Sequence, residues 1–107
     1  MKRVVVTGIG VVSCLGNNQE EVYQSLLNSK SGITFSEEYK EFNLKSHVHG
    51  IPNIKLEDYV DRKVIRFMGP GSAYNYIAMK EAVKDSGLEE KDVSNFLTGM
   101  IMGSGGP

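Results

Sequence analysis

The order of apolar and polar residues along the chain predicts two buried strands with helices between them. Three valines at 4–6 form the first apolar run, and Gly8 and Gly10 follow it. The second run, FLTGMIMG, has its strand at 100–102 and leads into serine and glycine. Continuous apolar runs of this kind are typical of strands buried on both faces of a parallel sheet.

The first predicted helix lies in NNQEEVYQSLLNSKSG. Asn18 is a good N-cap residue with Glu21 three positions later, as in a capping box. The helix is expected to reach Lys30 and to end before Gly32. Its apolar face carries Val22, Leu26 and Leu27.

Residues 33–53 mix short apolar and polar pieces, which predicts an irregular segment. Within it, SHVHG at 46–50 is a candidate short strand. A second helix is predicted over 56–68, with an apolar face made by Val60, Val64, Phe67 and Met68. A third begins at Pro70 and stops at Gly87, a left-handed C-terminal cap. Its apolar stripe of Ala78, Met79, Ala82 and Val83 lies opposite Lys80, Glu81, Lys84 and Asp85.

This strand, helices, strand order predicts an α/β fold with a parallel sheet covered by helices. Two strands do not complete such a sheet, so the remaining strands are expected beyond Pro107. No repeat, linker or low-complexity tract divides the sequence. Residues 1–107 are therefore expected to belong to one domain with no internal boundary.

Composition excludes several classes of protein. The chain has 107 residues, 40% of them hydrophobic and 23% charged, with a net charge of −1. It is therefore expected to fold, and it lacks the global positive charge that attracts nucleic acid or anionic membranes. No run approaches the roughly 20 apolar residues of a membrane span, and no signal peptide is evident, so the expected location is the cytoplasm. The single cysteine, Cys14, cannot form an internal disulfide.

Three motifs suggest chemistry but have simpler explanations. TGIGVVS resembles a dinucleotide-binding fingerprint, yet Ser13 replaces its third glycine, so a tight turn is the better interpretation. His47 and His49 would share one face of a strand, but no third metal ligand has a recognisable spacing. Cys14 lies among apolar residues with no helix starting directly after it, which favours a structural thiol.

A cluster of three cationic residues gives a stronger signal. At about 100° per residue, Arg62, Lys63 and Arg66 fall within roughly one third of the helix circumference. A solvated helix face is the simpler alternative. Because no acidic residue interrupts this face, the pattern favours an acidic partner.

Five segments resemble a known family in order and spacing. These are KRVVVTGIGVVSCLGNN, SKSGITF, SHVHG, DRKVIRFM and the closing GSGG. They resemble the N-terminal part of the β-ketoacyl-acyl-carrier-protein synthase I family, the condensing enzymes of bacterial fatty acid synthesis. The resemblance covers essentially the whole chain. One departure is Pro70, which stands where the family more often has an acidic or small residue.

The resemblance implies a thiolase-like fold, layered α/β/α/β/α and built from two similar halves, normally in a homodimer. This chain would hold only its N-terminal part: the first strand, the helices and the second core strand. The family condenses acyl and malonyl thioesters with decarboxylation, using a cysteine at a helix N-terminus and two histidines. No cofactor or metal is implied.

None of the catalytic residues is expected in this chain. SCLG does not match the family's Ala-Cys motif, and His47 and His49 lie in the wrong part of the sequence. The chain alone is therefore expected to be inactive, as an N-terminal piece of a condensing enzyme. The alternative is a non-catalytic module that binds acyl carrier protein.

Two groups of site residues follow from the resemblance. Arg62, Lys63 and Arg66 match positions that dock the acidic helix of acyl carrier protein. The loop residues Gly105, Gly106 and Pro107 match the family's glycine-rich loop beside the acyl pocket.

Overall fold

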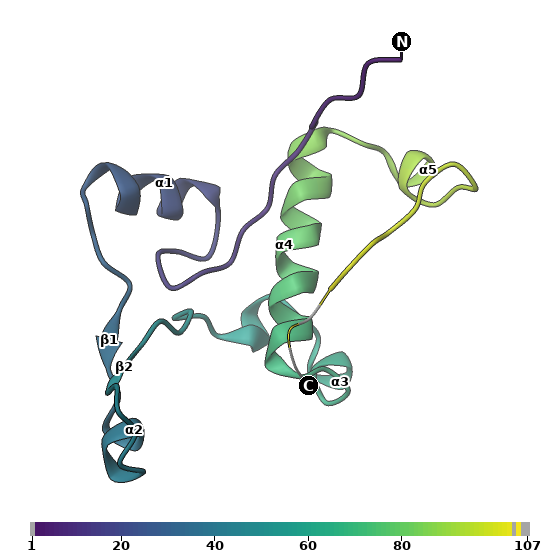
Figure 1. Ribbon diagram of the computed structural model, residues 1–107. Helices are drawn as coiled ribbons and strands as arrows, with labels where there is room; N and C mark the ends of the chain where they lie inside the picture. Colours follow the sequence, from purple (N-terminus) through teal and green to yellow (C-terminus); the bar gives the residue numbers. More distant parts are fainter. Residues whose placement is uncertain (1, 104, 106–107) are drawn as a thin grey trace. The chain divides into compact units, whose positions relative to one another are not determined.

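The computed structural model describes residues 2–103 and 105 (Figure 1). These residues form two compact units, each described here by itself. The first unit consists of residues 12–54. The second, called the α4 unit, joins the chain up to Val11 to the chain from Lys55 onward.

Helix α1 (Gln19–Leu27) opens the 12–54 unit and is capped at both ends. The Asn18 side chain accepts the N–H of Glu21 at 2.9 Å, which confirms the predicted N-cap. The helix ends earlier than expected, because Ser29 adopts a left-handed conformation with φ of 51°. Its N–H donates to the Leu26 carbonyl, and the Lys30 N–H donates to the Ser25 carbonyl, as in a Schellman motif. The predicted stop at Gly32 is therefore wrong.

The remainder of this unit contains two short strands joined by a short helix. β1 (Thr34–Phe35) and β2 (Val48–His49) pair antiparallel, with Thr34 opposite His49. Helix α2 (Glu37–Glu41) connects them and begins at Ser36, whose side chain accepts the Tyr39 N–H. The candidate strand at 46–50 is thus confirmed.

Helix α4 (Pro70–Ser86) is the longest element of the second unit, and both of its predicted ends are confirmed. Pro70 occupies the first turn, and Gly87 stops the helix with φ of 69°. The buried apolar residues of the described chain all belong to this unit: Val60, Ala73 and Ile77. The unit also contains helix α5 (Glu90–Val93). No described helix is long and apolar enough to cross a bilayer.

The predicted helix over 56–68 is wrong in its extent. A 3₁₀ turn, η1 (Leu56–Asp58), is followed by a separate short helix, α3 (Arg62–Ile65). The break occurs at Asp61, whose side chain accepts the Lys63 N–H at 2.7 Å and starts a new helix. Of the expected apolar face, Val60 is buried, whereas Phe67 is 91% exposed.

The two predicted buried strands are also corrected. Residues 4–6 and 100–102 belong to no strand, and Figure 1 draws both as loops. Val4 is 92% exposed and Ile101 is 97% exposed. A strand exists only where a neighbour accepts and donates its backbone hydrogen bonds, and neither run pairs with another described segment. The predicted parallel sheet is therefore not formed within the described residues.

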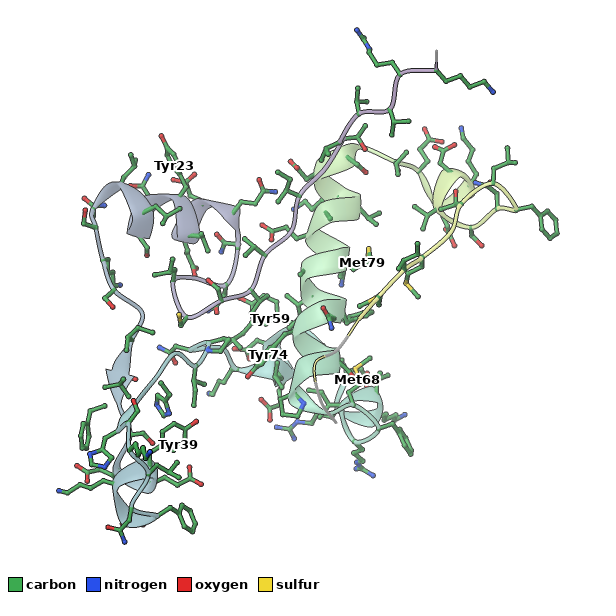
Figure 2. The ribbon with its side chains drawn as sticks, viewed as in Figure 1. Tyr23, Tyr39, Tyr59, Met68, Tyr74 and Met79 are labelled. Atoms are coloured by element: carbon green, nitrogen blue, oxygen red, sulfur yellow. The ribbon has the colours of Figure 1, made fainter. Side chains whose placement is uncertain are left out.

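The segment 8–11 lies against α4. The N–H of Ile9 donates to Asp85, and the N–H of Val11 donates to Glu81. A Cβ atom added at Gly10 would overlap the Ala78 carbonyl, so only glycine allows this approach. One hollow of about 260 Å³ is lined by Gly10, by α4 and by the segment 101–103. Met79, labelled in Figure 2, is among its lining residues.

Candidate functional site

Arg62, Lys63 and Arg66 form the candidate site and are called the basic face. Asp61 caps the start of α3, and Arg66 keeps helical dihedral angles at its end. Residues 62–66 are therefore one continuous helical stretch, although α3 is short. At about 100° per residue, the three cationic side chains still project within roughly a third of the circumference.

The basic face is exposed and carries uncompensated charge. All three of its residues are exposed. Lys40 pairs with Glu37 and Lys91 with Glu89, and no described residue forms an ion pair with the basic face. The three cations are therefore available to carboxylates or phosphates of a partner.

Apolar side chains stand beside these cations. Val64 is 45% exposed and Phe67 is 91% exposed, although the sequence placed both on the apolar face of a longer helix. A shallow hollow lined by residues 57–63 includes both Glu57 and Asp58 and the cationic Arg62 and Lys63. The stretch 57–67 therefore combines exposed cations, apolar side chains and carboxylates.

The two histidines make aromatic contacts. His47 lies edge-on to Phe35, with ring centroids 6.0 Å apart, and His49 lies edge-on to Tyr39, with ring centroids 5.4 Å apart. Tyr39 is labelled in Figure 2. Among the described residues, no group of three or more His, Cys, Asp or Glu side chains is placed to hold a metal ion.

Cys14 is half-buried between two glycines of the 12–54 unit. A Cβ atom at Gly50 would lie 2.9 Å from the Cys14 sulfur, and one at Gly32 would overlap the Cys14 carbonyl. The nearest following helix, α1, begins only at Gln19. The thiol therefore does not lie at a helix N-terminus, where reactive cysteines are often found.

The TGIG segment faces carboxylates. The N–H of Ile9 donates to Asp85, and the N–H of the next residue after the segment, Val11, donates to Glu81. These amides are thus occupied by negative groups that would repel a phosphate. The sequence analysis placed Glu81 and Asp85 opposite the apolar stripe of this helix and missed their role as acceptors. The alternation of Gly8 and Gly10 with larger residues was the signal that the segment approaches another backbone closely.

The predicted acyl-pocket loop is only partly described. Gly105 is exposed, with nothing within 4 Å of the position of an added Cβ atom. Gly106 and Pro107 lie outside the described residues. The assignment of this loop stays a prediction.

Comparisons with known proteins identify the family. Residues 1–106 match the family model of the beta-ketoacyl synthase N-terminal domain. The chain therefore belongs to this family, and the resemblance seen in its sequence is confirmed.

Similar proteins carry the name 3-oxoacyl-[acyl-carrier-protein] synthase. Synthase 1 of Haemophilus influenzae is 49% identical over 105 residues, which are 98% of this chain and 26% of that protein. Synthase 1 of Escherichia coli K12 is 50% identical over 109 residues, 99% of this chain and 26% of that protein. Synthase 2 of Staphylococcus aureus N315 is 33% identical, over 97% of this chain and 25% of that protein. The chain spans about a quarter of these relatives' length.

Proposed function

We propose that these residues form the N-terminal part of a 3-oxoacyl-acyl-carrier-protein synthase. Such an enzyme extends fatty acids by decarboxylative condensation of acyl and malonyl thioesters. The family match and the 49–50% identity to synthase 1 proteins, against 33% to a synthase 2, support this assignment. The cytoplasm is the proposed location, and a homodimer is the proposed assembly.

The chain would contribute framework and partner binding rather than the reacting groups. Cys14 has glycines on two sides and no helix N-terminus beside it, and His47 and His49 contact aromatic rings. The nucleophilic cysteine and the histidines that stabilise the enolate would come from other parts of the enzyme. No metal or cofactor is part of the proposed reaction.

The thiolase-like layered fold is part of the same proposal. Its support is the hollow of about 260 Å³, where Gly10 and residues 101–103 approach the same face of α4. In the layered fold, α4 would cover a parallel sheet that contains 4–6 and 100–102. The exposed valines and Ile101 would then be buried by neighbouring strands. Gly105, Gly106 and Pro107 would form the loop beside the acyl pocket.

The basic face would bind acyl carrier protein. The observation that carries this proposal is that Arg62, Lys63 and Arg66 are exposed, lie on one helical face and form no ion pair within the described chain. An acidic carrier would be steered to this face and held by pairs worth about 0.2 to 1 kcal/mol each.

Charge reversal in the full-length enzyme tests this assignment. In Lys63→Glu/Arg66→Glu, we expect a several-fold rise in KM for carrier-bound substrate at low salt, with little change in kcat. The effect should shrink as ionic strength rises, because salt screens exposed charges. Lys40→Glu/Lys45→Glu is the matched control, since it changes the net charge equally on exposed lysines of the 12–54 unit, which does not contain α3.

A small thioester that bypasses the carrier separates docking from folding. Its KM should be unaffected by the double reversal. Equal loss with both substrates would indicate a folding defect, and an equal effect of the control pair would indicate net charge alone. Either result would remove the docking role from the basic face. No condensing activity in the unchanged full-length protein would overturn the assignment as a synthase.

A further inference from the structure

Two backbone amides of the N-terminal segment meet two carboxylates of α4 in matching steps. The N–H of Val11 donates to Oε2 of Glu81 at 2.9 Å, and the N–H of Ile9 donates to Oδ2 of Asp85 at 3.0 Å. Two residues of extended chain advance about 6.6 Å, and four residues of helix advance about 6 Å. The two repeats match, so carboxylates one helical turn apart can accept hydrogen bonds from every second amide of the segment. The segment runs antiparallel to the helix, because the later amide pairs with the earlier carboxylate.

Each of these amides is preceded in the chain by a glycine, Gly8 or Gly10, that lies close to the helix backbone. A Cβ atom at Gly8 would overlap the Ala82 carbonyl and approach the Ser86 nitrogen to 2.6 Å, and one at Gly10 would overlap the Ala78 carbonyl. A shift of the segment by one residue would force Ile9 or Val11 into these positions. The spacing of the hydrogen bonds would still allow a shift by two residues, but that shift would bring Val6 or Val12 to one of the two glycine positions. The glycines therefore exclude the neighbouring registers.

We propose that Glu81 and Asp85 are positioning residues that, together with Gly8 and Gly10, lock segment 8–11 onto α4 in a single register. This lock also affects the residues that precede segment 8–11. Side chains of an extended chain alternate between two faces, so fixing residues 9 and 11 also fixes the face that each valine at 4–6 presents. The lock thereby sets the register of the chain that enters the proposed sheet.

Amide hydrogen exchange in the full-length protein tests the lock residue by residue. Glu81→Leu removes the acceptor of Val11 and should speed exchange of that amide about tenfold or more, with a smaller change at Ile9. Asp85→Leu should do the reverse, by several-fold, since the Ile9 bond is more exposed. Lys84→Leu is the matched control, because it lies between the two carboxylates and bonds to neither amide.

Conservative variants separate positioning from general stability. Glu81→Gln keeps an acceptor oxygen and should restore Val11 exchange to within about threefold of the unchanged protein. Should Glu81→Leu not fold, Glu81→Asp draws the carboxylate back by one methylene and should speed Val11 alone. Gly10→Ala should speed both amides together, because it displaces the segment.

Two results would overturn the proposal. One is unchanged exchange at both amides in the Leu and Asp variants. The other is an equal acceleration at Ile9, Val11 and unrelated α4 amides, which would show global destabilisation only. The exchange rates at Ile9 and Val11 do not depend on carrier binding. Either of these two results would therefore overturn the register proposal and leave the proposed function of the basic face unaffected.

Discussion

Helix α1 (Gln19–Leu27) and the segment 96–102 differ in where their interactions come from. At α1, Asn18 and the left-handed Ser29 satisfy the helix ends within a few residues of the helix itself. In the segment, Phe96, Leu97 and Ile101 are almost fully exposed, and no backbone ladder forms with another described residue. Elements whose end hydrogen bonds form locally are thus present among the described residues, whereas the apolar segment forms no regular structure there.

The largest expected effect comes from a charge in the apolar segment. In the full-length enzyme, Ile101→Asp should lower the free energy of unfolding by more than about 3 kcal/mol, because the proposed sheet buries this side chain. In the 107-residue chain the same change should cost less than about 0.5 kcal/mol, since Ile101 is 97% exposed. Chemical denaturation of both proteins measures the difference. Equal effects would mean that residue 101 enters no buried sheet.

A smaller effect is expected at the start of α1. Asn18→Ala removes the acceptor of the Glu21 N–H and should destabilise the protein by about 1 kcal/mol. Denaturation followed by far-ultraviolet circular dichroism measures this loss. Asn18→Asp keeps an acceptor oxygen and is the control, with an expected change below about 0.5 kcal/mol. A neutral alanine variant would show that the local cap contributes nothing.

The smallest effect is expected at the end of α1, and it has the opposite sign. Ser29→Gly should stabilise the protein by about 0.5 kcal/mol, because φ of 51° is strained for serine and free for glycine. Ser29→Ala keeps the strain and should give no gain. Thermal unfolding of the three proteins separates these outcomes, and destabilisation by glycine would argue against the left-handed cap.

The local features of the fold were predictable from the sequence. Asn18, Pro70 and Gly87 are residue types with strong end preferences, and the structure uses each as predicted. Ser29 was missed because serine rarely adopts left-handed angles, so the helix was extended to the next glycine. The helix break at Asp61 was missed because the apolar spacing continues through it, although an aspartate can restart a helix.

The basic face was predictable from the sequence because it, too, depends only on local spacing. The spacing of Arg62, Lys63 and Arg66 requires only five helical residues, so the shorter α3 still places them on one face. The role of Glu81 and Asp85 depends on a segment 70 or more residues away in sequence. No periodicity within α4 distinguishes a carboxylate that faces water from one that faces a backbone amide.

The close fit around Cys14 has a consequence for how this sequence can vary. Gly32 has space for a hydrogen atom only, because the backbone carbonyl of Cys14 stands where a methyl group would lie. At Gly50, a methyl group would instead meet the Cys14 sulfur at 2.9 Å. A smaller side chain at position 14 relieves the second contact and leaves the first unchanged. Related sequences should therefore keep glycine at position 32, and any bulk gained at position 50 should be accompanied by a smaller residue at position 14.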